Sequence, residues 1–420
     1  MCKLGPDLTR TLRSTEKRTP SHMKLLIASS APTDGGAGIS AYSRSLAVAL
    51  SAAGHEIHYA SPAHQDSSFV EEHRITHFET HPEADPQSNA KDLLRYVVEQ
   101  EIEGCVNNDN PVLQSIAPGL PVPILVICHM DRRIVAGLCA FHSDSIDHLV
   151  CISNDMQRTM IQRYGFPNTK CVLVHNGTFD PGHSGDFTQH DPNKLHVVVT
   201  GGYNSHKGGT RVMDSILAHP ALFKNVRIDW FGPVPESAQQ KLSQFSDIKF
   251  AGQVPQAVFH ETLRASDVLV FASNKEGCPM TMLEAMAAGV MPIATDGVGA
   301  MRWLIESGHE GFIVHLKDFA NQLAQCVEFL AQRPETVASM KQAARDRYLA
   351  DFQASENAER IIDLLKRPTL DRTNPPRSFE IAAWHRPLLS AGQRPTMMQR
   401  VRYRTGWLER AGTISIEGVQ

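Results

Sequence analysis

The chain of 420 residues lacks several patterns that would assign it to a large class of proteins. It has no run of 18 apolar residues, so no membrane-spanning helix is predicted. None of its eight cysteines forms a C-x-x-C pair, and most lie inside apolar runs, which favours reduced, buried thiols in a cytosolic protein. The formal net charge is only −4, so the chain as a whole is not attracted to nucleic acid.

Short runs rich in Ile and Val recur along the chain and alternate with helical patterns. The first series includes MKLLIASS, PVPILVICH and CVLVHNG, and the second includes LHVVVTG, DVLVFAS and VMPIATD. Such runs are typical of buried parallel strands joined by helical crossovers. Residues 179–194, dense in Gly, Pro, Asp and His, suit a domain linker between the two series. The sequence therefore predicts two doubly wound α/β domains.

The two ends of the chain do not share this pattern. Residues 1–22 are polar, carry both charge signs and show no period, so we expect a disordered leader. Residues 366–410 hold ten Lys and Arg against three acids, with Trp384, Tyr403 and Trp407 among them. Two interpretations of this basic tail stay open: a solvated or loosely packed segment, or a contact with anionic lipid or an acidic partner.

A glycine-rich loop follows the first predicted strand. Gly36, Gly38 and Ala41 satisfy G-x-G-x-x-A at the start of a helix, where glycines let the backbone approach a ligand and free N–H groups favour an anion. A nicotinamide site would also need an acid at the end of the second strand, but that strand ends at Tyr59-Ala60-Ser61. An anion-binding loop and a tight turn without a ligand both remain open.

The stretch EGCPMTMLEAMAAG follows the run DVLVFAS, so it begins at the carboxyl end of a strand, where open α/β sheets bind ligands. Pro279 and Gly289 suit the start and the end of a helix over 279–288. Its N-terminus would favour a phosphate. Glu276 and Glu284 would repel that phosphate unless each carboxylate had its own hydroxyl partners, which a sugar would supply.

The segment from Ala265 to Thr295 resembles the signature of the retaining family-4 glycosyltransferases, and Glu276 and Glu284 match their E-x7-E motif. VTGGYNSHKGG resembles the family's strand–loop–Lys–Gly element, and CVLVHNGTFD resembles its interdomain segment. The resemblance covers about 23–365 and implies a GT-B fold, in which two Rossmann-like domains face each other across a cleft. The expected parts are a leader (1–22), an acceptor domain (23–185), a donor domain (186–353), a helix that crosses back (354–366) and the basic tail (367–420).

The resemblance also implies roles for single residues. Glu276 would contact the donor sugar, Glu284 the ribose, and His129 the donor sugar and the reacting centre. Lys207 would neutralise charge as the nucleoside diphosphate departs. The expected catalytic residues are His129, Lys207 and Glu276, and the expected donor-binding residues are Gly36, Gly38, His206, Lys207, Val254, Gly277, Pro279, Met280, Thr281, Met282 and Glu284.

Two positions depart from the family pattern. Gly202 stands where the family usually has Arg before the phosphate-loop Lys, so His206 or Arg211 would have to substitute, or the enzyme would be slow or inactive. Trp303 stands where the family usually has Glu. No D-x-D pair and no zinc spacing occur, so we expect no metal ion.

The sequence thus predicts a cytoplasmic, retaining, metal-independent glycosyltransferase. It would move a sugar from a nucleotide-diphosphate sugar to a hydroxyl of a glycan or lipid-linked acceptor, in polysaccharide or cell-envelope glycan synthesis. No further cofactor and no nucleic acid partner are expected, and the basic tail allows a peripheral contact with the inner membrane face. The open alternatives are a catalytically impaired sugar-nucleotide-binding protein, a GT-B sugar epimerase or phosphorylase, and a nicotinamide oxidoreductase.

Overall fold

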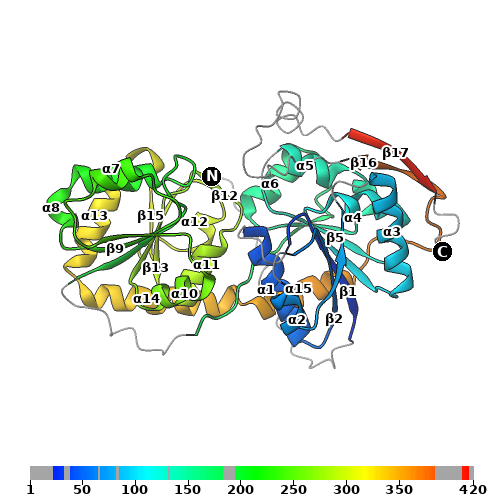
Figure 1. Cartoon of the computed structure of the whole chain (residues 1–420), viewed down its shortest axis with the longest axis horizontal. Helices are drawn as coiled ribbons and strands as arrows, with labels where there is room; N and C mark the ends of the chain where they lie inside the picture. The colour runs from blue at the N-terminus through cyan, green and yellow to red at the C-terminus, as the bar shows by residue number, and fades with distance from the viewer. Residues whose placement is uncertain are drawn as a thin grey trace, which may run out of the picture.

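A computed structural model describes residues 22–32, 38–64, 67–81, 85–130, 133–182, 194–383 and 409–415. The predicted leader, apart from His22, and Gly36 lie outside the described residues, as does most of the predicted linker, which includes the expected domain boundary at 185. The described chain forms two α/β domains that lie side by side (Figure 1).

The N-terminal domain is built on a seven-stranded parallel sheet with the order β3-β2-β1-β4-β5-β6-β7. Its strands β4, β5 and β6 are buried along their whole length, because helices cover both faces of the sheet. The strands are β1 (Lys24–Ser29), β2 (Glu56–Ser61), β3 (Thr76–Glu79), β4 (Gly104–Asn108), β5 (Ile124–Cys128), β6 (His148–Cys151) and β7 (Cys171–Leu173). The helices are α1 (Gly38–Ala52), α2 (Ser68–Glu72), α3 (Pro86–Glu99), α4 (Pro111–Ile116), α5 (Arg133–Ala140) and α6 (Asn154–Gln162).

The C-terminal domain has a six-stranded parallel sheet with the order β10-β9-β8-β11-β13-β15. Its strands are β8 (His196–Val199), β9 (Arg227–Phe231), β10 (Ile248–Gly252), β11 (Val268–Phe271), β13 (Met291–Thr295) and β15 (Phe312–Val314), and the short β12 (Lys275–Glu276) pairs with β14 (Val298–Gly299). The helices are α7 (Gly209–Ala218), α8 (Pro220–Phe223), α9 (Glu236–Lys241), α10 (Gln256–Arg264), α11 (Met280–Ala287), α12 (Met301–Leu304), α13 (Phe319–Ala331) and α14 (Pro334–Asp351). The prediction of two doubly wound α/β domains is confirmed.

The chain crosses between the domains at two neighbouring places. Thr178, after β7, exchanges backbone hydrogen bonds with the turn before α15 (Ala354–Leu365): its N–H donates to the Phe352 carbonyl at 3.0 Å, and its carbonyl accepts from the Ala354 N–H at 3.0 Å. The helix α15 then lies on the N-terminal domain, where Asn357 accepts a hydrogen bond from the Tyr42 hydroxyl at 3.2 Å. One apolar cluster runs from the N-terminal sheet through α11 to α15, so the two domains share a core.

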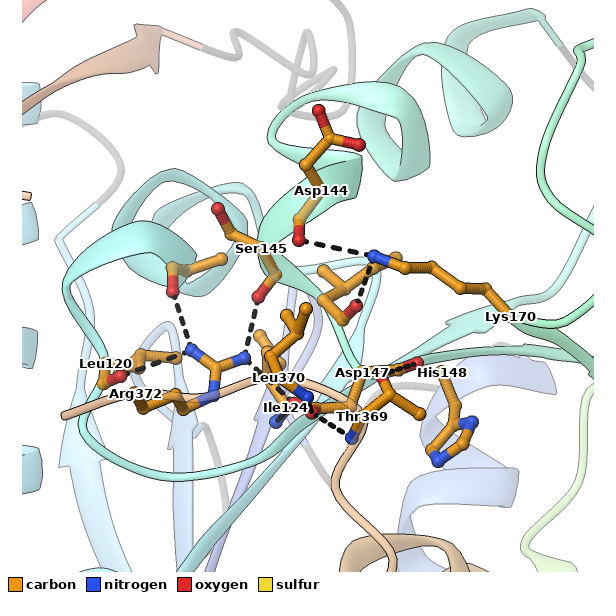
Figure 2. Close-up of polar contacts among 12 residues, drawn as sticks. Leu120, Ile124, Asp144, Ser145, Asp147, His148, Lys170, Thr369, Leu370 and Arg372 are labelled. Carbon is orange, nitrogen blue, oxygen red and sulfur yellow. Dashed lines mark hydrogen bonds and ion pairs between the residues drawn. The ribbon is translucent and has the colours of Figure 1, made fainter. Parts of the chain in front are cut away.

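The segment after α15 is fastened to the N-terminal domain (Figure 2). Arg372 donates to the Asp147 carboxylate at 2.8 Å and to the backbone carbonyls of Ala117, Leu120 and Ser145. The same carboxylate accepts from the Thr369 N–H at 2.9 Å. We call residues 367–373 the strap.

Beyond the strap, β16 (Ser378–Ala383) pairs antiparallel with β17 (Glu409–Ser415) and packs against α4. Within the predicted basic tail of 366–410, Arg372 and the N–H groups of Thr369 and Leu370 bind the buried Asp147, whereas Thr369 and most other residues of the strap are exposed. Both interpretations of this tail stay predictions. The aromatic residues Trp384, Tyr403 and Trp407 lie outside the described residues. Within the described part of the chain, no helix is long and apolar enough to cross a membrane.

Candidate active site

A cavity of about 530 Å³ lies between the two domains, at the carboxyl ends of their strands. Both sides of the cavity mix apolar and polar side chains, and Lys207 and Lys275 come from the C-terminal domain. The N-terminal lining includes Gly38, Ile39, His129, Met130, Ile152, Asp155 and Met156, and the C-terminal lining includes Gly201, His206, Lys207, Lys275, Glu276, Gly277, Pro279, Met280 and Thr281.

The domains touch at one wall of this cavity. A Cβ atom on Gly277 would lie 2.2 Å from the backbone carbonyl oxygen of His129, so only glycine allows this approach. Next to it, the Asn176 side chain donates to the carbonyl oxygen of Cys278 at 2.9 Å. The two predicted halves of the site are thus brought face to face.

Glu276 and Lys207 form an ion pair on the side of the cavity that the C-terminal domain contributes. The Lys207 Nζ lies 2.7 Å from Oε1 of Glu276, which also accepts a hydrogen bond from the Ser273 hydroxyl at 2.6 Å. Glu276 is held by the β12–β14 ladder and is 14% exposed, whereas Lys207 is 42% exposed. An ion pair this open to solvent contributes little to stability, so its place at the cavity is the more informative feature.

The helix α11 points its N-terminus at the same cavity. It begins at Met280, one residue later than predicted, with Pro279 as its N-cap. Met280 and Thr281 line the cavity in the first turn, where backbone N–H groups have no partner within a helix. The N–H of Met282 donates back to the Pro279 carbonyl at 3.1 Å, and its side chain is buried in the core.

Three of the predicted donor-binding residues lie outside the lining of this cavity: Val254, Met282 and Glu284. The carboxylate of Glu284 is buried and accepts a hydrogen bond from Gln256 at 3.1 Å, with His260 at 3.5 Å. Val254 lies two residues beyond Gly252, which borders a second hollow of about 540 Å³ together with Tyr203 and Phe250.

His129 follows β5 and lies almost completely buried at the edge of the cavity. Its Nε2–H donates to Oδ1 of Asn108 at 2.9 Å, and the Tyr42 ring stands edge-on at 5.2 Å. Burial lowers the pKa of His129 to about 4, so the ring is neutral at pH 7.

The backbone explains why Gly202 stands at the position of the family's usual Arg. Gly202 has a left-handed φ of +68°, and a Cβ atom there would lie 2.7 Å from the Pro233 carbonyl oxygen. Of the two substitutes considered, His206 lines the cavity. The guanidinium of Arg211 instead donates to the carbonyls of Ser205 and Ala272 and holds the loop.

Sequence reasoning missed two polar residues of the site, Asn108 and Asp155. Asp155 joins the domains, because it accepts from the Gly299 N–H at 3.1 Å and from Arg302 at 2.9 Å. Burial raises the pKa of Asp155, but the hydrogen bonds from Arg302 and Gly299 outweigh that effect and hold the pKa below its ordinary value. Asn108 is the last residue of β4, and Asp155 lies shortly after the end of β6. Their position at the carboxyl ends of strands could have identified both residues as candidates for the site.

Trp303, the second departure from the family pattern, is 40% exposed and lies outside the cavity lining. Nowhere in the described part of the chain do three or more His, Cys, Asp or Glu side chains gather closely enough to hold a metal ion.

Two family models match the chain, one on each domain. The model described as Glycosyltransferase Family 4 matches residues 36–178, and the model described as Glycosyl transferases group 1 matches residues 194–333.

Curated relatives match over shorter stretches. A trehalose synthase of Pyrococcus horikoshii is 35% identical over 102 residues, which cover 24% of either chain. A putative glycosyltransferase, EpsD of Bacillus subtilis, is 35% identical over 105 residues, 25% of this chain and 27% of the relative. The lipopolysaccharide core biosynthesis mannosyltransferase LpsB of Rhizobium meliloti is 32% identical over 163 residues, 36% of this chain and 45% of the relative. The chain thus matches from about a quarter to under half the length of these relatives.

Solved structures match over most of the chain. A glycosyltransferase from Rickettsia africae has a TM-score of 0.68 at 16% identity and covers 83% of this chain and 99% of its own. HepE of Anabaena, solved in complex with UDP-glucose, has a TM-score of 0.65 at 19% identity and covers 82% of this chain and all of its own. At this identity the likeness shows the fold, which is GT-B as predicted. With one family model on each of the two facing domains, the chain belongs to the family-4 glycosyltransferases of GT-B fold.

Proposed function

We propose that the chain is a retaining, metal-independent glycosyltransferase that moves a sugar from a nucleoside-diphosphate sugar to an acceptor hydroxyl. The observation that carries this proposal is the interdomain cavity in which Lys207 and Glu276 lie beside the first turn of α11. The UDP-glucose complex of HepE and the mannosyltransferase LpsB support a nucleotide-sugar donor and a role in cell-envelope or polysaccharide synthesis.

In this proposal the diphosphate lies at the N-terminus of α11. The helix dipole and the N–H groups of the first turn favour an anion there. Lys207 turns from Glu276 to the phosphates and stabilises the charge that grows as the nucleoside diphosphate leaves. Glu276 is then free to accept hydrogen bonds from donor-sugar hydroxyls, and Ser273 keeps it in place.

His129 does not act as a strong base in this scheme. Burial lowers the pKa of His129 to about 4, so it binds a proton too weakly to take one from a hydroxyl at pH 7. A phosphate oxygen of the donor accepts the acceptor's proton instead. The protein positions the two substrates and excludes water where Gly277 meets His129.

The acceptor enters along the N-terminal side of the cavity. Ile39, Met130, Ile152 and Met156 give this side an apolar part, and His129, Ser153, Asp155 and Asn176 give it a polar part. This mixture suits a glycan or lipid-linked acceptor, which has both an apolar face and hydroxyl groups. The basic residues of 366–410 other than the buried Arg372 support a peripheral contact of the protein with an anionic membrane surface.

The test begins with thermal-shift measurements against a panel of nucleotide sugars. The sugar that binds is then used to measure release of nucleoside diphosphate by wild type, Lys207→Ala and Glu276→Gln. Each variant should lower turnover at least tenfold, about 1.4 kcal/mol in barrier. Lys224→Ala, which removes an exposed lysine after α8, is the matched control and should keep wild-type turnover. Wild-type rates in both site variants would contradict the assignment.

The same assay tests whether the reaction retains the anomeric configuration and whether it needs a metal ion. The anomeric configuration of the product, read by NMR, should equal that of the donor, and a chelator should leave the rate unchanged. Inversion would refute the retaining mechanism, and loss of activity on chelation would refute metal independence.

A second candidate is a sugar-nucleotide-binding protein with little or no turnover. Gly202 favours it, because the family's usual arginine is missing and the backbone leaves no room for a side chain. Such a protein would show a thermal shift with a nucleotide sugar but would release no nucleoside diphosphate with any acceptor.

A further inference from the structure

A buried hydrogen-bond chain reaches His129 from two neighbouring elements. Asn108 ends β4, beside β5, and is completely buried. Its Nδ2 donates to the hydroxyl oxygen of Ser43 on α1 at 3.0 Å. This bond turns Oδ1 toward Nε2 of His129, which lies 2.9 Å away.

The hydrogen bonds that run from Ser43 through Asn108 to His129 determine which ring nitrogen of His129 carries the hydrogen. An amide oxygen can only accept, so Nε2 must donate and therefore carries the hydrogen. The ring is neutral and has a single N–H, which leaves a lone pair on Nδ1. No described residue forms a hydrogen bond with Nδ1 of His129. His129 lines the cavity whereas Asn108 does not, so the edge of the ring that bears Nε2 faces the protein interior.

We infer that Asn108 is a positioning residue, which holds His129 as the Nε2–H tautomer so that Nδ1 accepts a hydrogen bond from a ligand hydroxyl in the cavity. The identification of that hydroxyl as one of the donor sugar rests on the proposed function. A ligand group that can only accept a hydrogen bond would meet the Nδ1 lone pair unfavourably. Asn108 thereby selects a hydroxyl at this point of the site without touching the ligand.

The tautomer can be read directly by NMR. Long-range ¹H–¹⁵N spectra of the full chain with labelled histidine separate pyrrole-type from pyridine-type nitrogens, and His129→Gln assigns the signals. At pH 7.5 the wild type should show a pyrrole-type Nε2 and a pyridine-type Nδ1 for His129. A hydrogen on Nδ1 in the wild type would overturn the inference.

Asn108→Ala removes the acceptor of Nε2–H. Its His129 should become a mixture of the two tautomers, and kcat/KM for the donor should fall at least tenfold. The matched control is Asn107→Ala: Asn107 is equally buried, and the substitution removes its hydrogen bonds to Gln114 and Asn110, but Asn107 forms no hydrogen bond with His129. Asn107→Ala should keep the wild-type tautomer and, for the folded fraction, the wild-type kcat/KM.

If Asn108→Ala does not fold, Ser43→Ala takes its place, because it loosens the Asn108 amide while it removes only one oxygen. It should shift the His129 tautomers in the same direction by a smaller amount. An unchanged tautomer in whichever of the two variants folds would contradict the inference.

A binding experiment separates this inference from the proposed function. The nucleotide sugar with the largest thermal shift should move the Nδ1 resonance of His129 toward the position of a hydrogen-bonded nitrogen, whereas its free nucleoside diphosphate should not. Equal spectra with both ligands would overturn the inference even if sugar transfer occurs. A shift of Nδ1 by the sugar without any transfer to an acceptor would instead contradict the proposed function and leave the role of Asn108 standing.

Discussion

The loop that carries Lys207 depends on backbone conformations that favour glycine. Gly201, Gly202 and Gly208 have φ values of +91°, +68° and +80°. A Cβ atom on Gly208 would lie 1.9 Å from the Ala272 carbonyl oxygen, and one on Gly202 would meet Pro233. The loop therefore folds tightly against the ends of β9 and β11 and presents Lys207 to the cavity. An arginine at 202 is incompatible with this packing.

We predict that Gly202→Ala destabilises the protein more than Gly165→Ala does. Both glycines have a left-handed backbone conformation, with φ of +68° and +73°. An alanine at either position therefore costs about 1–2 kcal/mol in backbone strain. Only the Cβ at 202 also meets a backbone oxygen, since nothing lies within 4 Å of a Cβ at 165. Urea unfolding measures the difference. Equal losses of unfolding free energy would show that the loop can move aside.

Among the elements, the strap shows how a segment without a hydrophobic pattern becomes ordered. Arg372 and Asp147 are almost fully buried, and the carboxylate also accepts from backbone N–H groups of Ile124, Thr369 and Leu370. Both terminal nitrogens of Arg372 donate to buried or half-buried acceptors, whereas its Nε is buried without a hydrogen-bond partner among the described residues. A buried charge is tolerated where most of its hydrogen bonds are satisfied in this way. No periodicity in 367–373 indicates this, because the partners come from distant parts of the chain.

Removal of Arg372 from its buried ion pair with Asp147 should lower the free energy of unfolding. Arg372→Ala leaves the Asp147 carboxylate buried without its counter-charge, and we expect a loss of about 3–5 kcal/mol in unfolding free energy. Arg367→Ala is the matched control, because Arg367 pairs with Asp363 at 4.0 Å on the surface, where the side chains are 69% and 68% exposed. Such a surface pair contributes about 0–1 kcal/mol. Chemical denaturation compares the two, and similar losses would contradict the structural role of the strap.

At the scale of the whole molecule, three contacts help to determine how the domains face each other, in addition to the apolar cluster that they share. Gly277 touches the backbone of His129, Asp155 binds the N–H of Gly299, and the two chain crossings are hydrogen-bonded to each other at Thr178. The first two contacts border the cavity, and the third lies where a hinge between the domains would have to bend. The cavity therefore depends on the separation of the domains.

We predict that Gly277→Ala forces the domains apart, because its Cβ would lie 2.2 Å from the His129 carbonyl oxygen. The radius of gyration from small-angle X-ray scattering should rise, and KM for the donor should increase. Gly311→Ala introduces a clash of the same kind, 2.1 Å from the Pro292 carbonyl oxygen, but inside one domain. It should lower stability without a change in the radius of gyration. An unchanged radius for both variants would mean that the contact at Gly277 does not hold the domains.

The sequence by itself determined the two sets of strands, the place of α11 and the candidate residues Lys207, Glu276 and His129. These features are local, since burial periodicity, helix start signals and motif spacing are all read within short stretches of chain. Only the tertiary structure decided that Gly277 meets His129, that Asn108 and Asp155 belong to the site, and that Gly202 leaves no room for arginine. Those contacts join atoms that are close in space because strands and domains pack together, and the spacing of residues along the chain does not encode such distances.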